Sequence, residues 1–187
     1  MARAQRIPTL TATPRRLPVK TPDTAPILLG YDGSPGSLRA VEIAGALFPG
    51  HKAIVLHVWS PIAVIAAACG GGMVSLPAYD DAVLEGAAFK VAASGARAAA
   101  AAGLDARAEV TVVTYDGTAH AILAAADRHD ACLIVLGARG LSAFKSVLLG
   151  SVSHSVAQHS NRPVLVVPPT LDDRAAVESI ERIAATV

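Results

Sequence analysis

The stretch "VLGARGLSAFKSVLLGSVSHSV", residues 135–156, sets two glycines three positions apart directly behind an apolar run. Gly137 and Gly140 are followed, further along the same stretch, by Gly150 and Ser151, where a helical pattern begins. Glycine lets a backbone turn tightly and approach a bound group, and the first amides of a helix attract anions. The spacing therefore predicts a cradle for a negatively charged group, such as the phosphates of a nucleotide.

Short β-rich runs alternate with longer helical patterns on both sides of this stretch. The continuous apolar run before Gly137 is typical of a strand whose sheet is covered on both faces, and the alternation is typical of repeated βαβ units. We therefore expect an α/β fold, with an open, Rossmann-like parallel sheet of five strands and helices on both faces. The expected strands are residues 27–33, 53–59, 106–117, 131–137 and 163–168.

Apolar residues at helical spacing separate these strands. Ser34 is expected to cap the first helix, with Pro35 in its first turn, and Thr118 to cap the helix before the fourth strand. Gly103 is expected to end the alanine-rich helix. Glycine and proline interrupt residues 60–80 too often for one regular element, which predicts a long loop. The expected helices span residues 35–48, 80–102 and 118–127, and another begins near residue 151.

The two ends of the chain differ from the central region, residues 26–169, which we predict to be one domain. Residues 1–25 hold several prolines and basic residues but one acidic residue, which predicts a disordered basic extension. The frequent prolines argue against the alternative, an amphipathic targeting helix. Residues 170–187 gather apolar residues on one helical face, behind a cap at Asp172 or Asp173, and predict a C-terminal amphipathic helix.

The composition of the 187 residues, 52% hydrophobic and 17% charged, is that of a globular protein. A net charge of +1 gives no overall attraction to nucleic acid or to a membrane surface. The uncharged segment 53–79 is interrupted by glycines and prolines and does not predict a membrane span. Cys69 and Cys132 form neither a C-x-x-C pair nor a metal spacing, and no secretory leader opens the chain, so we expect a cytoplasmic protein.

Two common phosphate-binding motifs do not fit the chain. A P-loop requires G-x-x-x-x-G-K-[ST], and Lys145 with Ser146 supplies the last pair, but Arg139 and Phe144 stand at the glycine positions. The stretch "GYDGSPG", residues 30–36, lacks the glycine spacing of a dinucleotide-binding turn, and no acidic residue ends the next strand. The predicted cradle therefore belongs to another class.

The segment Gly137-Ala138-Arg139-Gly140, nine further residues and then Gly150-Ser151 resembles the nucleotide-binding signature of the universal stress protein family, G-x-x-G-x9-G-[ST]. The resemblance runs from about Ile27 to Pro168. The stretch "ILLGYDGS" resembles the family's first strand with its aspartate, "VLHVW" the second strand, and "HSNRPVLVVP" the closing strand. The chain departs from the family at Cys132, where an aspartate often stands.

The resemblance implies the strand order 3-2-1-4-5, in which Asp32 and Gly137 meet where the winding direction reverses. It also implies a site for ATP or a related adenine nucleotide, accompanied by Mg²⁺, and a homodimer that forms through the strand Pro163 to Val167. The phosphates would be held by Gly137, Arg139, Gly140, Gly150 and Ser151, and the adenine and ribose by Asp32, Leu136 and the backbone of Val58.

Simpler roles remain open for several of these residues. Asp32 could serve only as a turn residue before the first helix, and Ser151 only as a helix cap. Arg139 flanks the cradle, where its charge would either add contacts to phosphate or remain solvated. His154 and His159 are five positions apart and do not share a helical face, so we predict no metal site built from side chains alone.

Three functions are compatible with this site. The first is a regulatory protein of the stress response that binds an adenine nucleotide. The second is an enzyme that slowly hydrolyses ATP or phosphorylates itself, and the third is a dimerisation module without nucleotide. Catalysis requires a positioned base or an activated nucleophile, and Ser151 has no obvious basic partner. We therefore predict binding rather than catalysis and assign no catalytic residue.

Overall fold

The computed structural model describes residues 25–61, 81–113, 116–140 and 149–168. Several expectations fall outside these residues: the basic extension, all but the first two residues of the long loop 60–80 with Cys69, the residues Phe144 to Ser146, and the C-terminal amphipathic helix. The predicted domain boundaries therefore remain predictions.

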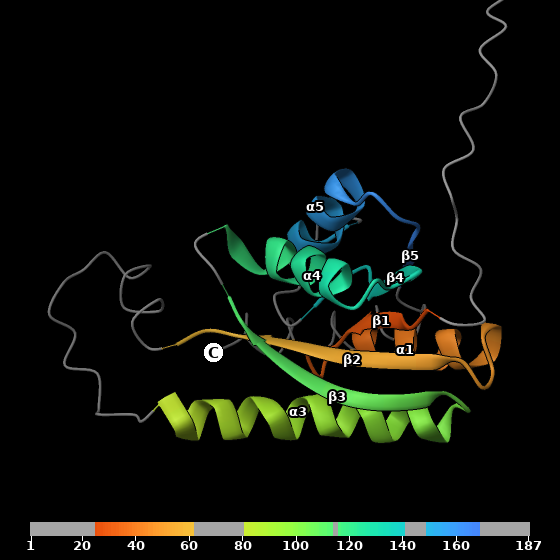
Figure 1. Cartoon of the computed structure of the whole chain (residues 1–187), viewed down its shortest axis with the longest axis horizontal. Coiled ribbons are helices and arrows are strands. Elements are labelled where there is room, and N and C mark those ends of the chain that lie inside the picture. The colour runs from red at the N-terminus through yellow and green to blue at the C-terminus, as the bar shows by residue number, and fades with distance from the viewer. Residues whose placement is uncertain (1–24, 62–80, 114–115, 141–148, 169–187) are drawn as a thin grey trace, which may run out of the picture.

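One parallel sheet of five strands organises the described residues, and its order β3-β2-β1-β4-β5 confirms the expected topology. In Figure 1 the strands cross the middle of the molecule, with β3 and β5 at the two edges. The first strand ends at Gly30, three residues earlier than expected, because Tyr31 and Asp32 leave the sheet. The strands are β1 Ile27–Gly30, β2 Lys52–Trp59, β3 Asp105–Val112, β4 Leu133–Gly137 and β5 Val164–Val167.

Helices cover both faces of the sheet. Figure 1 shows α3 on one side of β2 and β3, and α4 and α5 on the other. Neighbouring residues of β1 point to opposite faces: Leu29 packs with Val41 of α1, and Leu28 packs with Ile122 of α4. This double burial explains why the strands read as continuous apolar runs. The helices are α1 Pro35–Leu47, α3 Asp81–Ala101, α4 Gly117–Arg128 and α5 Ser151–His159.

The observed helix ends can be compared with the predicted cap residues. Ser34 caps α1 as expected, since its Oγ accepts the amide of Ser37 at 3.2 Å. Gly103 follows α3 with a φ of +92°, which confirms its role as the terminating glycine. The prediction for Thr118 is wrong, because α4 begins at Gly117 with Asp116 in the cap position. The cap therefore stands two residues earlier than predicted, and Gly117, the first residue of α4, has a φ of +87°.

The arginine Arg162, just before β5, holds the C-terminal end of α4. Its Nη1 donates to the carbonyl oxygens of Ala126 at 2.8 Å and Ala131 at 2.7 Å, and its Nη2 pairs with the carboxylate of Asp127. A helix C-terminus leaves carbonyl groups without intrahelical donors, and a cation is favoured there. Arg162 therefore ties the turn after α4 to the edge strand β5.

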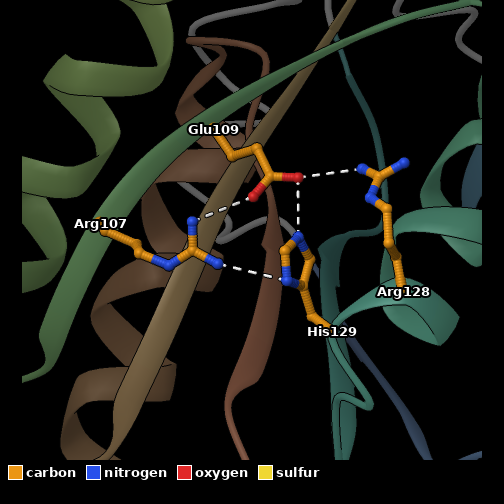
Figure 2. A network of polar contacts seen from close by, with 4 residues as sticks. All are labelled: Arg107, Glu109, Arg128 and His129. Atoms are coloured by element: carbon orange, nitrogen blue, oxygen red, sulfur yellow. Dashed lines mark hydrogen bonds and ion pairs between the residues drawn. The ribbon is translucent and has the colours of Figure 1, made fainter.

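A second polar network joins β3 to the end of α4 (Figure 2). Glu109 accepts from Nη1 of Arg107 at 3.1 Å, Nη2 of Arg128 at 3.0 Å and Nε2 of His129 at 2.8 Å. Nδ1 of His129 lies 3.2 Å from Nη2 of Arg107. Because arginine only donates, Nδ1 accepts here and Nε2 carries the proton that bonds to Glu109. Partial burial alone would raise the pKa of Glu109, but the His129 and Arg128 hydrogen bonds, with the nearby positive charges, lower it overall.

We expect Glu109→Gln to lower the free energy of unfolding by about 1 kcal/mol at neutral pH. A carboxylate whose pKa is lowered by folding stabilises the protein above its unfolded pKa, and that contribution disappears as the pH falls through the folded value. The gap between wild type and variant should therefore shrink below about pH 4.5, the ordinary glutamate value. Urea titrations between pH 7 and pH 3 measure it, with the exposed Glu85→Gln as control, and a gap independent of pH would contradict the assignment.

The glycine Gly95 allows α3 to pack closely on the sheet, and its replacement is a second test of the fold. A Cβ at this position would lie 2.6 Å from Cδ1 of Tyr31 and 2.8 Å from Cγ1 of Val55. Gly95→Ala should therefore cost about 1–3 kcal/mol of unfolding free energy through overpacking. Gly86 of the same helix has no atom within 4 Å of its added Cβ, so Gly86→Ala should stabilise by about 0.5–1 kcal/mol. Equal denaturation midpoints for the two variants would contradict this packing.

Candidate functional site

A cavity of about 1030 Å³ opens beyond the carboxyl ends of β1, β2 and β4. This is the place where an open parallel sheet reverses its winding direction and leaves a crevice for ligands. The cavity is large enough for a mononucleotide. All eight residues predicted for the site lie in its wall: Asp32, Val58, Leu136, Gly137, Arg139, Gly140, Gly150 and Ser151.

Gly137, at the end of β4, and Gly140, in the loop after it, both lie close to other parts of the protein. A Cβ at Gly137 would lie 2.6 Å from the carbonyl oxygen of Gly36, in the first turn of α1. The sequence predicts that the missing side chain of Gly137 lets a ligand approach the backbone. The structure shows that it also lets α1 approach. A Cβ at Gly140 would lie 2.5 Å from Oδ2 of Asp32. The ends of β1 and β4 therefore meet as expected, with Asp32 beside Gly140.

The two carboxylate oxygens of Asp32 lie in different surroundings. Oδ1 accepts the amide of Ser34 at 3.0 Å, which fixes the turn into α1. Oδ2 lies on the Gly140 side, in the wall of the cavity. Asp32 therefore does serve as a turn residue, through Oδ1. Its second oxygen, Oδ2, lies on the side of the loop after β4.

The first turn of α5 lines the same cavity. Gly150 is the cap residue, so the alternative that Ser151 is only a cap is wrong. The amide of Gly150 donates to the carbonyl of Ala138 at 2.7 Å and is not available to a ligand. The next three amides, of Ser151, Val152 and Ser153, precede the first intrahelical bond, from His154 to Gly150, and have no intrahelical acceptor.

A buried hydroxyl holds this helix in place. Oγ of Ser153 donates to the carbonyl oxygen of Gly137 at 2.7 Å, and Ser153 is 5% exposed. The bond fastens the first turn of α5 to the end of β4. Sequence reasoning missed Ser153, although a serine in the first turn behind a Gly-Ser pair was a usable signal.

The side chain of Arg139 carries an unsatisfied donor. Its Nε is buried and has no hydrogen-bond partner among the described residues. Buried polar groups in folded proteins nearly always have a partner, and an arginine donor matches phosphate or carboxylate oxygens well. Arg139 also lines the cavity. The wall of the cavity therefore includes both an arginine and the first turn of α5, a combination that fits an anionic ligand.

Several further residues of the wall were not predicted. His57 lies directly before Val58, and Thr118 and Ile122 come from the first two turns of α4. The rule that ligands bind near strand ends could have suggested His57, two residues before the end of β2, and Thr118, in the first turn of the helix after β3. His154 adds an exposed imidazole on α5. Among the described lining residues, Asp32 is the one with a carboxylate.

Two kinds of feature, a cluster of metal-binding side chains and a membrane-spanning helix, are absent from the part of the chain that the structure describes. No group of three or more His, Cys, Asp or Glu side chains is placed to hold a metal ion there. No helix in these ranges is long and apolar enough to span a membrane. Cys132 is a single thiol whose Sγ lies 3.4 Å from the carbonyl oxygen of Ala25, and partial burial raises its pKa.

Comparisons with known proteins agree with the geometry. The family model described as the universal stress protein family matches residues 24–168. The chain is 34% identical over 149 residues to the universal stress protein YxiE of Bacillus subtilis, a match that covers 75% of this chain and 97% of that protein. It is 35% identical over 146 residues to a universal stress protein of Thermus aquaticus, covering 75% of this chain and 96% of the relative.

Solved structures show the same architecture. A universal stress protein in complex with cAMP superimposes with a TM-score of 0.54 and 29% identity, over 78% of this chain and 98% of the other. The universal stress protein of Archaeoglobus fulgidus in complex with dAMP gives a TM-score of 0.53 at 20% identity, over 76% and 97%, and supports the fold alone. With the family model covering most of its length, this chain belongs to the universal stress protein family.

Proposed function

We propose that the chain binds an adenine nucleotide, ATP or a close relative, in the cavity at the winding reversal, and that it acts as a nucleotide-binding regulator of the stress response. Two observations carry the proposal: Arg139 has a buried Nε without a partner among the described residues, and the first amides of α5 have no intrahelical acceptor. Both groups belong to residues that line the cavity. The relative solved with cAMP supports an adenine nucleotide as the ligand class. A cytoplasmic location is part of the same proposal.

The phosphates would lie between the loop after β4 and the first turn of α5. Ser151 offers an amide and a hydroxyl there, and Arg139 offers a guanidinium. Gly137 and Gly140 let this loop pass close to α1 and Asp32, and Gly150 forms the turn into the helix. The amide dipoles at the start of α5 favour negative charge without any side chain.

The nucleoside would lie between the ends of β1, β2 and β4. Oδ2 of Asp32 would accept from a ribose hydroxyl, and the backbone of Val58 would bind the base. Leu136, which is 4% exposed, would form part of an apolar wall with Ile122 of α4. A largely apolar pocket with a few fixed polar groups is typical of sites for small organic ligands.

A Mg²⁺ ion fits this proposal as a companion of the phosphates. Magnesium is commonly held by phosphate oxygens and waters with one or two carboxylates, and it does not require a cage of protein ligands. Asp32, the carboxylate among the described lining residues, would be the protein's contribution to such an ion.

The edge strand β5, Val164–Val167, would pair with its counterpart in a second copy of the chain. It ends the sheet on one side, and an edge strand offers unpaired donors and acceptors to another strand. Sedimentation equilibrium of the full chain distinguishes a dimer, which the proposal expects, from a monomer, which would remove this part of it.

Turnover is the main alternative to simple binding. The proposal requires occupancy of the site and no chemical step. Slow hydrolysis or autophosphorylation would appear as phosphate release or label incorporation with ATP, and multiple turnover would favour the enzyme over the regulator.

Arg139→Gln tests the phosphate site. Loss of a charged hydrogen bond costs about 1.5–3 kcal/mol, so the affinity for ATP should fall by roughly 10- to 100-fold. The affinity for inorganic tripolyphosphate should fall similarly, while adenosine binding should not change. Isothermal titration measures all three ligands.

Arg97→Gln is the matched control, because Arg97 is an exposed arginine on α3 and does not line the cavity. It should bind ATP as wild type does. If Arg139→Gln also binds ATP as wild type does, Arg139 has no part in holding the phosphates.

A further inference from the structure

The ladder between β1 and β2 ends where the cavity begins. In a parallel sheet, alternate residues of a central strand direct both their N–H and their C=O to one neighbour. The amide of Tyr31 donates to the carbonyl of Leu56 at 2.9 Å, so Leu56 faces β1. The amide of Val113 donates to the carbonyl of Trp59 at 2.8 Å, so Trp59 faces β3. Val58 therefore faces β1, as Leu56 does.

The strand β1, however, stops before it reaches Val58. The last registered pair is Gly30 with Leu56. If the ladder continued in register, the amide of Val58 would donate to the carbonyl oxygen of Tyr31. No such bond joins these two described residues.

The carbonyl oxygen of Tyr31 instead faces the ring of His57. Nδ1 of His57 lies 2.8 Å from it. A carbonyl oxygen only accepts, so Nδ1 must carry the proton and donate. Both the neutral ring with this tautomer and the doubly protonated ring satisfy the requirement. The imidazole therefore already bonds to the carbonyl oxygen that the Val58 amide would use in a continued ladder, and competes with that amide for it.

We propose that His57 is a positioning residue that ends the β1–β2 ladder one bond early, and so keeps the amide and carbonyl of Val58 open to the purine base of the ligand. The inference rests on the proposed nucleotide function and adds the residue that prepares its base subsite. An open N–H and an open C=O on one residue complement adenine, which presents a ring-nitrogen acceptor next to its amino donor.

His57→Leu removes the donor and frees the Tyr31 carbonyl for the Val58 amide. The affinity for ATP should then fall about fivefold to tenfold, which corresponds to one net hydrogen bond. The affinity for inorganic tripolyphosphate, which has no base, should stay as in wild type. His57→Asn keeps an N–H near the position of Nδ1 and should restore most of the ATP affinity.

Hydrogen exchange of the Val58 amide tests the same idea without ligand. In the wild type this amide should exchange quickly for a residue inside a strand. In His57→Leu it should exchange at least several-fold more slowly, because it gains the Tyr31 carbonyl. A general loosening of the fold would change exchange in the opposite direction, so this readout separates positioning from a merely structural role.

His159→Leu is the matched control, because His159 makes the same type of contact, Nδ1 to the carbonyl oxygen of Ser155 at 2.8 Å, at an exposed place outside the cavity. It should leave ATP binding unchanged. The proposal is overturned if His57→Leu binds ATP as wild type does, if it loses tripolyphosphate equally, or if Val58 exchange does not slow. A wild type that binds no adenine nucleotide would instead defeat the proposed function, and the exchange comparison would still decide the role of His57.

Discussion

The early end of β1 is the constraint on which the site depends. The strand pairs with β2 up to Gly30 and with β4 up to Leu29, and then the chain turns out of the sheet at Tyr31 and Asp32. Strands β2 and β4 continue past the last residue pairs that they form with β1. Their ends therefore lie on either side of an opening, where β1 provides no hydrogen-bonding partner. Helices α4 and α5 cover one face of the sheet beside this opening, and α1 begins directly behind Asp32. A longer β1 would fill the place where the cavity lies.

Tight backbone contacts keep that opening in shape. The loop after β4 passes so close to α1 that no side chain fits at Gly137, and Asp32 lies against Gly140. Ser153 and the amide of Gly150 then bind the start of α5 to the same loop. Contacts within the protein therefore hold the loop after β4, α1 and the start of α5 together.

The fold could be predicted from the sequence because its signals are local. The apolar runs, the cap at Ser34 and the glycine at position 103 each depend on a few neighbouring residues, and all three were confirmed. The wrong cap at Thr118 shows the limit, since a backbone with positive φ at Gly117 starts α4 without any side-chain signal. The strand order followed from the family resemblance and was confirmed as well.

The site could be predicted only in part, because its remaining features arise from distant segments. The glycine and serine spacing marked the loop that lines the cavity, and the binding role of those residues remains a prediction. A further requirement for glycine at 137 comes from α1, about a hundred residues earlier in the chain, and no local pattern indicates it. No local pattern predicts the contact of His57 with Tyr31 or the hydrogen bonds of Arg162 to the end of α4.

The claim at the centre of this account is that the opening beyond β1 is a preformed site for adenine nucleotides. Native mass spectrometry of the full chain, purified gently and then incubated with equimolar ATP and GTP in the presence of Mg²⁺, tests it most directly. The account predicts one adenine nucleotide bound per chain, with the guanine nucleotide excluded or much weaker. A chain that carries neither nucleotide, or both equally, would contradict it.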